Sequence, residues 1–312
     1  MKVFANFPHE VPDNPCYSVV TVGVFDGVHR GHQHIFAAAL AGSPPGGVAV
    51  VTFDPHPRAV LGPPKRARLL SPLDERLALF AAYPLGAAAV LRFDQQLARM
   101  SYVDFVRTLL VERLGARRLV LGYNVSLGHE RQGNTERLGA LGRELGFEVT
   151  SVPAFEVEGA PVSSTRIRHL LDAGRVADAA VLLGRPYWLE GTVVRGSGRG
   201  HRIGVPTANL QLVPEKLVPA RGVYAARVRV NGQVHGGALN VGVVPTFVDA
   251  GSQSVEIHIL DFDGDLYGAR LRVDCIARLR DERKFDGPAA LQAQIRLDIA
   301  AARRCLGATP ES

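Results

Sequence analysis

The stretch SVVTVGVFDGVHRGHQHIF, residues 18–36, changes its hydrophobic pattern part-way along and carries polar residues at the change. Its Val-rich first part is typical of a buried strand, whereas the apolar, Ala-rich run at 35–40 favours a helix. Gly23, Asp26 and Gly27 interrupt the pattern between the two. A strand that turns into a helix aims backbone N–H groups and the positive end of the helix dipole at the space above the sheet. We therefore predict a phosphate site at this turn.

The side chains of the turn support this prediction. His29 and His32 are one helical turn apart and share a face, and Gly31 between them lets a ligand approach the backbone closely. Taken alone, the motif is equally compatible with a plain turn followed by a surface helix.

Outward from this stretch, apolar runs of strand length alternate with segments of helix length. Strands are expected at 48–53, 87–93, 118–123 and 147–152, and helices at 73–83, 102–114, 135–145 and 170–183. The two prolines of FDPHP, residues 53–57, predict a rigid loop at a strand end, where open α/β sheets bind ligands. This alternation predicts an α/β domain with a doubly wound parallel sheet, Rossmann-like, over residues 1–183.

A second polar motif, VSSTRIR at 162–168, lies near the end of this domain. Its hydroxyl side chains are helix N-caps, and its arginines fall in the first turns of the helix that follows. Hydroxyls, free N–H groups and guanidinium groups can therefore converge on one anion. The alternative is a capped surface helix with solvated arginines.

From residue 187 the pattern becomes that of a β protein. Strands are expected at 223–230 and 233–241, joined by the hairpin signal Asn231-Gly232, and again at 255–259 and 271–279. Short antiparallel strands and many glycines predict a small closed barrel over residues 184–312. A helix at 288–305, stopped near Gly307, should pack on the barrel.

Candidate chemistry in the barrel starts at a glycine-rich loop that contains Gly198, Gly200, His201 and Gly204. Such a loop can wrap its amides around phosphates, although it lacks the ending of a P-loop. The sequence PTAN then offers the oxygen atoms of Thr207 and Asn209, which suit Mg²⁺. Glu256, polar in an apolar strand, could accept a proton from a hydroxyl that attacks a γ-phosphoryl group. The alternatives are a glycine-rich barrel loop and a solvated surface Glu.

Composition narrows the class of protein. The 312 residues are long for one core, so two domains are expected, and 46% hydrophobic and 21% charged residues are ordinary for a globular protein. No apolar run reaches the roughly 18 residues of a membrane span, and the N-terminus has no signal-peptide pattern, so a cytoplasmic protein is expected. Cys16, Cys275 and Cys305 are far apart without a CxxC pair, which predicts free thiols.

The net charge of +6 is carried by scattered arginines, since four of the 36 basic residues are Lys. Small anionic substrates explain this balance as well as a nucleic acid does, and no aromatic interleaving or recognition motif favours nucleic acid. Small-molecule substrates are therefore expected, with neither nucleic acid nor membrane as partner, in a monomer or weak homo-oligomer.

The ordered motifs resemble those of prokaryotic bifunctional riboflavin kinase/FMN adenylyltransferases, also called bifunctional FAD synthetases. The resemblance covers nearly the whole chain. Besides the motifs above, it rests on GVFDGVHRGH (23–32), LLGRPYWLEGTVV (182–194), GVPTANL (204–210), RGVYA (221–225), LNVGVVPTF (239–247), VEIHILDFDGDLYG (255–268) and RDERKF (280–285).

The resemblance implies a nucleotidyltransferase-fold domain that adenylylates FMN to FAD, followed by a barrel that phosphorylates riboflavin to FMN, both with ATP and with Mg²⁺. It places His29, His32 and Arg166 at the reacting phosphates, Thr207 and Asn209 on Mg²⁺, and Glu256 as general base of the kinase. It implies further substrate contacts in the adenylyltransferase by Gly23, Phe25, Asp26, Gly31, Phe53, Asn124, Ser163, Ser164, Thr165 and Arg168, and in the kinase by Gly198, Gly200, His201, Gly204 and Pro206.

The chain departs from the family pattern after the strand at 118–123. Relatives usually have Asn or Asp, Phe, any residue, Phe and Gly, whereas Val125 and Leu127 stand here in place of the aromatic residues. His201 stands where Arg or Lys is frequent, and Val205 where Phe is common. Weak FMN binding is expected, and a kinase with a weakened or silent adenylyltransferase is the alternative. A flavin- or RNA-binding regulator without activity is the third possibility, against which the intact motifs argue.

Overall fold

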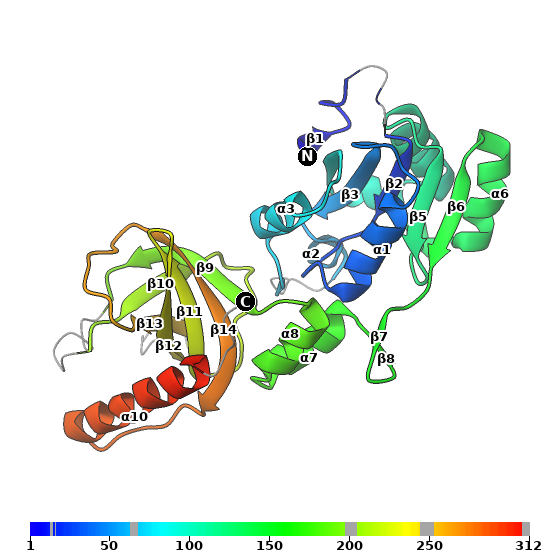
Figure 1. The fold of residues 1–312 in the computed structure, drawn as a ribbon. Helices are drawn as coiled ribbons and strands as arrows, with labels where there is room; N and C mark the ends of the chain where they lie inside the picture. Colours follow the sequence, from blue (N-terminus) through cyan, green and yellow to red (C-terminus); the bar gives the residue numbers. More distant parts are fainter. Residues whose placement is uncertain (13–14, 16, 63–67, 197–204, 244–252, 308–312) are drawn as a thin grey trace. The chain divides into compact units, whose positions relative to one another are not determined.

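The computed structural model describes residues 1–12, 15, 17–62, 68–196, 205–243 and 253–307. They form two compact units, Met1–Ser164 and Thr165–Ser312. The first contains a sheet with helices on both faces, and the second contains a barrel with a long C-terminal helix (Figure 1).

The sheet of the first unit is parallel, with strand order β1-β4-β3-β2-β5-β6. Successive residues of β3 alternate between two hydrophobic clusters, with Val48 and Val50 in one and Ala49 and Val51 in the other. This alternation confirms the doubly wound parallel sheet, because both faces of each strand are buried. The strands are β1 (Lys2–Phe7), β2 (Val19–Val22), β3 (Val48–Asp54), β4 (Ala87–Arg92), β5 (Arg118–Gly122) and β6 (Glu148–Val152).

Helices cover the two faces separately. Ile35 and Phe36 of α1 (Arg30–Leu40) and Phe80 of α3 (Leu73–Ala81) belong to one cluster. The opposite cluster includes apolar residues of the π-helix η1 (Phe105–Glu112) and of α6 (Thr135–Leu145). The smaller elements of this unit are α2 (Pro57–Leu61), α4 (Gln95–Arg99), α5 (Tyr102–Asp104), η2 (His129–Arg131), β7 (Glu156–Val157) and β8 (Ala160–Pro161).

Three local predictions for this unit need correction. Strand β1 was not expected from the sequence, because Phe4 and Phe7 are its only buried residues. The segment 102–114 is a short α-helical turn that continues as a π-helix, rather than one α-helix. The FDPHP loop is shorter than predicted, since β3 continues to Asp54 and Pro57 is the first residue of α2, where its missing N–H costs nothing.

The predicted single helix at 170–183 is wrong. The structure has α7 (Ser164–Asp172) and α8 (Val176–Leu183), separated at Gly174, which has a φ of 73°. That left-handed conformation ends a helix and favours Gly. Both helices belong to the second compact unit, except for Ser164, the first residue of α7. The expected division of function near residue 183 stays a prediction.

The second unit is built on a closed antiparallel barrel with strand order β10-β13-β12-β11-β14-β9. Leu189, Leu239 and Ile257 lie on the fully buried side of their strands, which forms the barrel interior. The barrel predicted from the sequence is confirmed. Its strands are β9 (Tyr187–Val194), β10 (Ala208–Leu212), β11 (Gly222–Val230), β12 (Gln233–Val243), β13 (Gln253–Ile259) and β14 (Arg270–Arg280).

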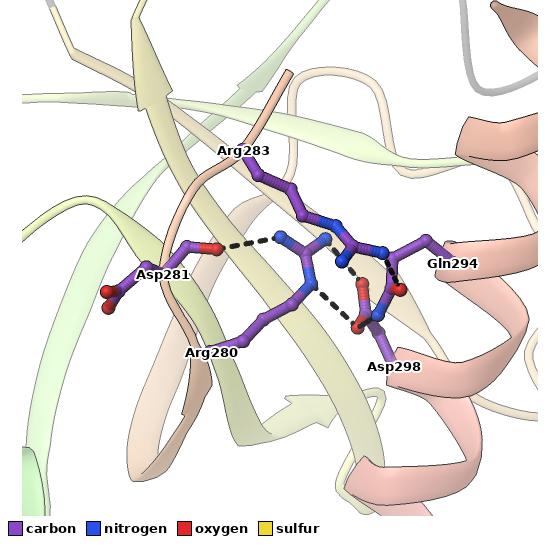
Figure 2. A network of polar contacts seen from close by, with 5 residues as sticks. All are labelled: Arg280, Asp281, Arg283, Gln294 and Asp298. Carbon is purple, nitrogen blue, oxygen red and sulfur yellow. Dashed lines mark hydrogen bonds and ion pairs between the residues drawn. The ribbon is translucent and has the colours of Figure 1, made fainter. Parts of the chain in front are cut away.

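The C-terminal helix α10 (Pro288–Gly307) packs on the outside of the barrel, as predicted, and includes Gly307. Ala302 of the helix is fully buried against Ala225 and Ala238 of β11 and β12. Figure 2 shows that a polar network also joins the helix to the end of β14 through Arg280 and Asp298.

Candidate active sites

The turn between β2 and α1 brings together the residues of the predicted phosphate site. His29 is the N-cap of α1, and its Nδ1 accepts a hydrogen bond from the backbone N–H of His32 at 3.4 Å. Because Nδ1 accepts, the ring proton of a neutral His29 is on Nε2. The two imidazole rings are stacked with centroids 3.6 Å apart. The first turn of the helix thus presents the positive end of the helix dipole beside two imidazoles, which suits an anion.

Close packing accounts for Gly23, Phe25 and Gly31 of the turn. A Cβ on Gly31 would lie 3.2 Å from the ring of His29, and one on Gly23 would lie 3.0 Å from the ring of Phe25. Phe25 is 3% exposed and meets His32 edge to face, with centroids 5.1 Å apart. Phe25 therefore supports the ring of His32 from within the core, and its predicted contact with substrate stays a prediction.

Asp26 has a structural position. Its carboxylate accepts hydrogen bonds from the backbone N–H groups of Leu70 and Ser71, at 3.1 and 2.9 Å. The hydroxyl of Ser71 accepts a bond from the N–H of Gly27, and the hydroxyl of Ser164 donates to the carbonyl of Asp26 at 2.9 Å. The turn is therefore fixed by segments distant in sequence, and the carboxylate of Asp26 is buried among them.

The other predicted residues of this site occupy different environments. Phe53 is partly buried and packs edge to face on Phe93, whereas Asn124 is exposed after the end of β5. Ser163 directly precedes α7. The helix begins with Ser164, Thr165 and Arg166, and Arg168 lies two residues further on. Thr165 is exposed, whereas the side chains of Arg166 and Arg168 are half-buried.

The loop that lacks the family's aromatic residues is divided between core and surface. Leu127 is 6% exposed and belongs to the hydrophobic core, where it forms an isolated bridge with Gly133. Val125 is only partly buried against the same core. Of the two positions, Val125 is therefore the better candidate for contact with a flavin.

In the barrel, the predicted kinase residues come together on the outer face. Asn209 of β10 and Asn240 of β12 are both paired with Glu256 of β13, one on each side. Paired residues on neighbouring strands share a face, and the outer face is the one opposite buried Val255 and Ile257. The hydroxyl of Thr207 donates to Oε2 of Glu256 at 3.4 Å. This arrangement brings a carboxylate, a hydroxyl and two amides into one row.

The same row contains side chains that the sequence did not single out. Glu282, Ser254 and Asn240 surround Gly242. A Cβ added to Gly242 would lie 2.9 Å from Oε1 of Glu282, 3.2 Å from Oγ of Ser254 and 3.4 Å from Nδ2 of Asn240. The alternation of β12 and β13 was a usable signal for Asn240 and Ser254, because both share the face of Glu256. Glu282 lies beyond β14, and no periodicity placed it here.

The oxygen donors of this row fit Mg²⁺. Thr207 and Asn209 offer a hydroxyl and an amide oxygen, and the amide of Asn209 lies against Gly196, where an added Cβ would come within 2.2 Å of Nδ2. Within the described ranges, no group of three or more His, Cys, Asp or Glu side chains could hold a metal ion. Gly198, Gly200, His201 and Gly204 lie outside the described residues. The carbonyl of Pro206 accepts a hydrogen bond from Nδ1 of His258 at 2.8 Å.

Two family models match the chain in succession: FAD synthetase over residues 11–166 and riboflavin kinase over residues 183–306. A bifunctional riboflavin kinase/FMN adenylyltransferase of Pseudomonas fluorescens is 39% identical over 287 residues, 91% of this chain and 92% of that protein. The protein of the same description from Escherichia coli (strain K12) is 36% identical over 96% of each chain. The chain belongs to the bifunctional riboflavin kinase/FMN adenylyltransferase family.

A solved structure supports the fold of this bifunctional family member. A crystal structure from Streptococcus pneumoniae, described as a macrolide-efflux protein, is 32% identical and has a TM-score of 0.87 over 96% of this chain and 98% of that one. Among the helices that the structure describes, none is long and apolar enough to cross a membrane.

Proposed function

We propose which unit and which residues carry out each of the two consecutive reactions of this bifunctional enzyme. These reactions are the phosphorylation of riboflavin to FMN and the adenylylation of FMN to FAD. The barrel carries the first reaction and the parallel-sheet unit the second. The observation that carries the kinase assignment is the row in which Asn209 and Asn240 flank Glu256 while Thr207 bonds to its carboxylate.

In the kinase step, Glu256 accepts the proton of the terminal ribityl hydroxyl as that oxygen attacks the γ-phosphorus of ATP. The new O–P bond forms, the bond between the γ-phosphorus and the bridging oxygen breaks, and ADP leaves. Thr207 and Asn209 would hold Mg²⁺, which neutralises charge on the transferred phosphoryl group when it is bound. Asn240, beside Glu256, is placed to orient the carboxylate or the ribityl chain.

In the adenylyl transfer, a phosphate oxygen of FMN attacks the α-phosphorus of ATP, and pyrophosphate leaves. The nucleophile is already ionised, so the work of the protein is positioning and charge stabilisation. His29, His32 and the first turn of α1 hold phosphates of ATP. The motif assigns Ser163, Ser164, Thr165 and Arg166 to the leaving pyrophosphate, with Asn124, Phe53 and Arg168 as further contacts.

One assay tests both assignments: riboflavin and ATP with Mg²⁺ are supplied, and FMN and FAD are separated by chromatography. Glu256→Gln should lower FMN formation by about 10²-fold or more, since a positioned general base contributes on this scale. FAD formation from supplied FMN should be spared.

Glu190→Gln is the matched control, because Glu190 is also on the barrel strands but is paired with Arg270 at 2.6 Å. Near-normal FMN formation by Glu256→Gln would remove Glu256 from the role of base.

The compartment and the oligomeric state of the protein are proposals as well. The proposed compartment is the cytoplasm, and the proposed oligomeric state is a monomer or weak homo-oligomer. Free thiols support the compartment: Cys275 and Cys305 are unpaired with each other, and burial raises the pKa of Cys275 to about 12, which keeps this thiol protonated and unreactive.

A further inference from the structure

Arg76 of α3 is 1% exposed, and it joins the ends of two neighbouring strands of the parallel sheet. Its Nη1 donates a hydrogen bond to the carbonyl of Val24 at 2.7 Å, and its Nη2 donates to the carbonyl of Phe53 at 3.0 Å. Val24 follows β2 and Phe53 lies near the end of β3. One planar guanidinium thus fixes the distance between the two strand ends that border the phosphate site.

A buried guanidinium is costly unless its charge and its donors are used. Burial lowers the pKa of Arg76, while the carboxylates of Asp26 and Asp54 act in the opposite direction and favour the charged form. Nε of Arg76 is buried, with no hydrogen-bond partner among the described residues. An apolar side chain of similar volume would avoid these costs, so stability alone gives a poor account of Arg at this position.

The hydrogen bonds of Arg76 add to those that join the turn to α3 and to the residues just before it. Asp26 binds the backbone N–H groups of Leu70 and Ser71, just before α3, and Ser71 binds Gly27. Arg76, the fourth residue of that helix, reaches back to Val24. The turn that ends at His29 is therefore held at Val24 by Arg76 of α3, and at Asp26 and Gly27 by the segment that precedes α3. Releasing either point frees the turn to shift.

We propose that Arg76 is a positioning residue for adenylyl transfer, which holds the turn at residues 24–29 and the end of β3 in the geometry that lets His29 and His32 meet the phosphates of ATP. This inference rests on the proposed function of the first unit. Arg76 itself is too deeply buried to contact substrate. Its effect on the rate acts through the carbonyls of Val24 and Phe53.

The expected effect follows from how steeply transfer rates depend on placement. A displacement of about 1 Å caused by a distant substitution can cost about 10²-fold in rate. Arg76→Met, which keeps an apolar side chain of similar length, should lower kcat for FAD formation by about 10- to 100-fold. FMN formation by the barrel of the same chain should stay within about twofold, because the carbonyls that Arg76 binds belong to the parallel-sheet unit.

Leu110→Ala is the matched control for a general loss of stability. Leu110 of η1 is fully buried in the hydrophobic cluster on the opposite face of the sheet from Phe25 and α3. The full chain carrying each substitution is compared for thermal unfolding, for FMN formation and for FAD formation from supplied FMN. At equal loss of thermal stability, Arg76→Met should lose FAD formation and Leu110→Ala should keep it.

Arg76→Lys separates bridging from charge. Lys keeps the positive charge but has no planar fork to bond two carbonyls in parallel, so this variant should also form FAD slowly, and it serves if Arg76→Met does not fold. Full FAD formation by Arg76→Lys, or equal losses of FAD formation in Arg76→Met and Leu110→Ala, would overturn the proposal. If the unchanged chain makes no FAD, the proposed function fails instead.

Discussion

At the scale of single residues, the two stacked imidazoles explain why the first turn of α1 is suited to phosphate. Stacking at 3.6 Å between centroids brings the rings too close for both to carry a charge without strong repulsion. An anion that bonds to both rings relieves this repulsion and allows them to be protonated together. The helix N-terminus adds its own attraction for negative charge. Binding of phosphate and protonation of the pair should therefore favour each other.

His32→Ala is the residue-scale prediction. It removes one ring of the pair and the edge-to-face contact with Phe25, so FAD formation should fall by about 10²- to 10³-fold, the usual cost of a donor lost at developing charge. FMN formation in the same chain should be normal. His34→Ala, on the exposed side of the same helix, is the control. Loss of both activities in His32→Ala would indicate damage to the fold rather than to the site.

At the scale of elements, α10 is tied to the barrel by one partly buried polar network as well as by apolar packing. Arg280 donates two hydrogen bonds to the carboxylate of Asp298, at 2.9 and 2.7 Å, and Gln294 donates a third at 2.7 Å (Figure 2). Asp298 is 6% exposed. Arg283, from the segment that also carries Glu282, bonds to Gln294. The network therefore fixes the segment after β14 that runs toward the row of Glu256.

Asp298→Asn should destabilise the barrel unit. The substitution removes one charge-bonded acceptor oxygen and leaves Arg280 partly buried without its counter-charge, which should cost about 1–3 kcal/mol of unfolding free energy after allowance for its partial exposure. Denaturant unfolding measures the change.

The control is Asp261→Asn, because Asp261 also accepts two bonds from an arginine of α10, Arg303, but both side chains are exposed. Exposed pairs contribute little, so this variant should unfold like the unchanged chain. Equal behaviour of the two variants would show that the network adds nothing beyond surface pairing.

Elements were predictable from the sequence where local pattern determines structure. The continuous apolar run at 48–53 became β3, and the alternation around Glu256 placed that residue on the outer face of the barrel. Strand β1 carries too few buried residues to stand out, and Gly174 ends a helix whose apolar pattern runs on. These differences arise because pairing with β4 and the backbone conformation of one glycine outweigh side-chain pattern.

The sites divide in the same way. His29, Gly31 and His32 were recognisable because neighbours in sequence form the site. The bonds of Asp26 to Leu70 and Ser71 join residues 44 and 45 positions apart, and those of Arg76 span 52 and 23 positions. No periodicity encodes such contacts, so the sequence did not reveal the bonds of Asp26 and did not single out Arg76; substrate contact by Asp26 stays a prediction.

At the scale of the whole molecule, the proposed function makes the product of one unit the substrate of the other. FMN made by the barrel becomes FAD only if the parallel-sheet unit binds FMN well. The intact turn of α1 and the VSSTRIR motif argue for working phosphate chemistry there, so the flavin contacts should set how much FMN is converted. FMN should therefore accumulate before FAD when riboflavin is limiting.

Val125→Phe tests whether the flavin contacts limit the conversion of FMN. Val125 is partly buried beside exposed Asn124, whereas the side chain of Leu127 is buried in the core. An aromatic stacking contact is worth about 0.5–1.5 kcal/mol, so KM for FMN should fall by about two- to tenfold and the early excess of FMN should shrink. Leu127→Phe should instead overpack the core and cost about 1–3 kcal/mol of stability without lowering KM. The double substitution should combine the two effects. An unchanged or raised KM for FMN in Val125→Phe, at normal stability, would mean that this loop does not contact the flavin, and that the conversion of FMN is limited at the phosphates after all.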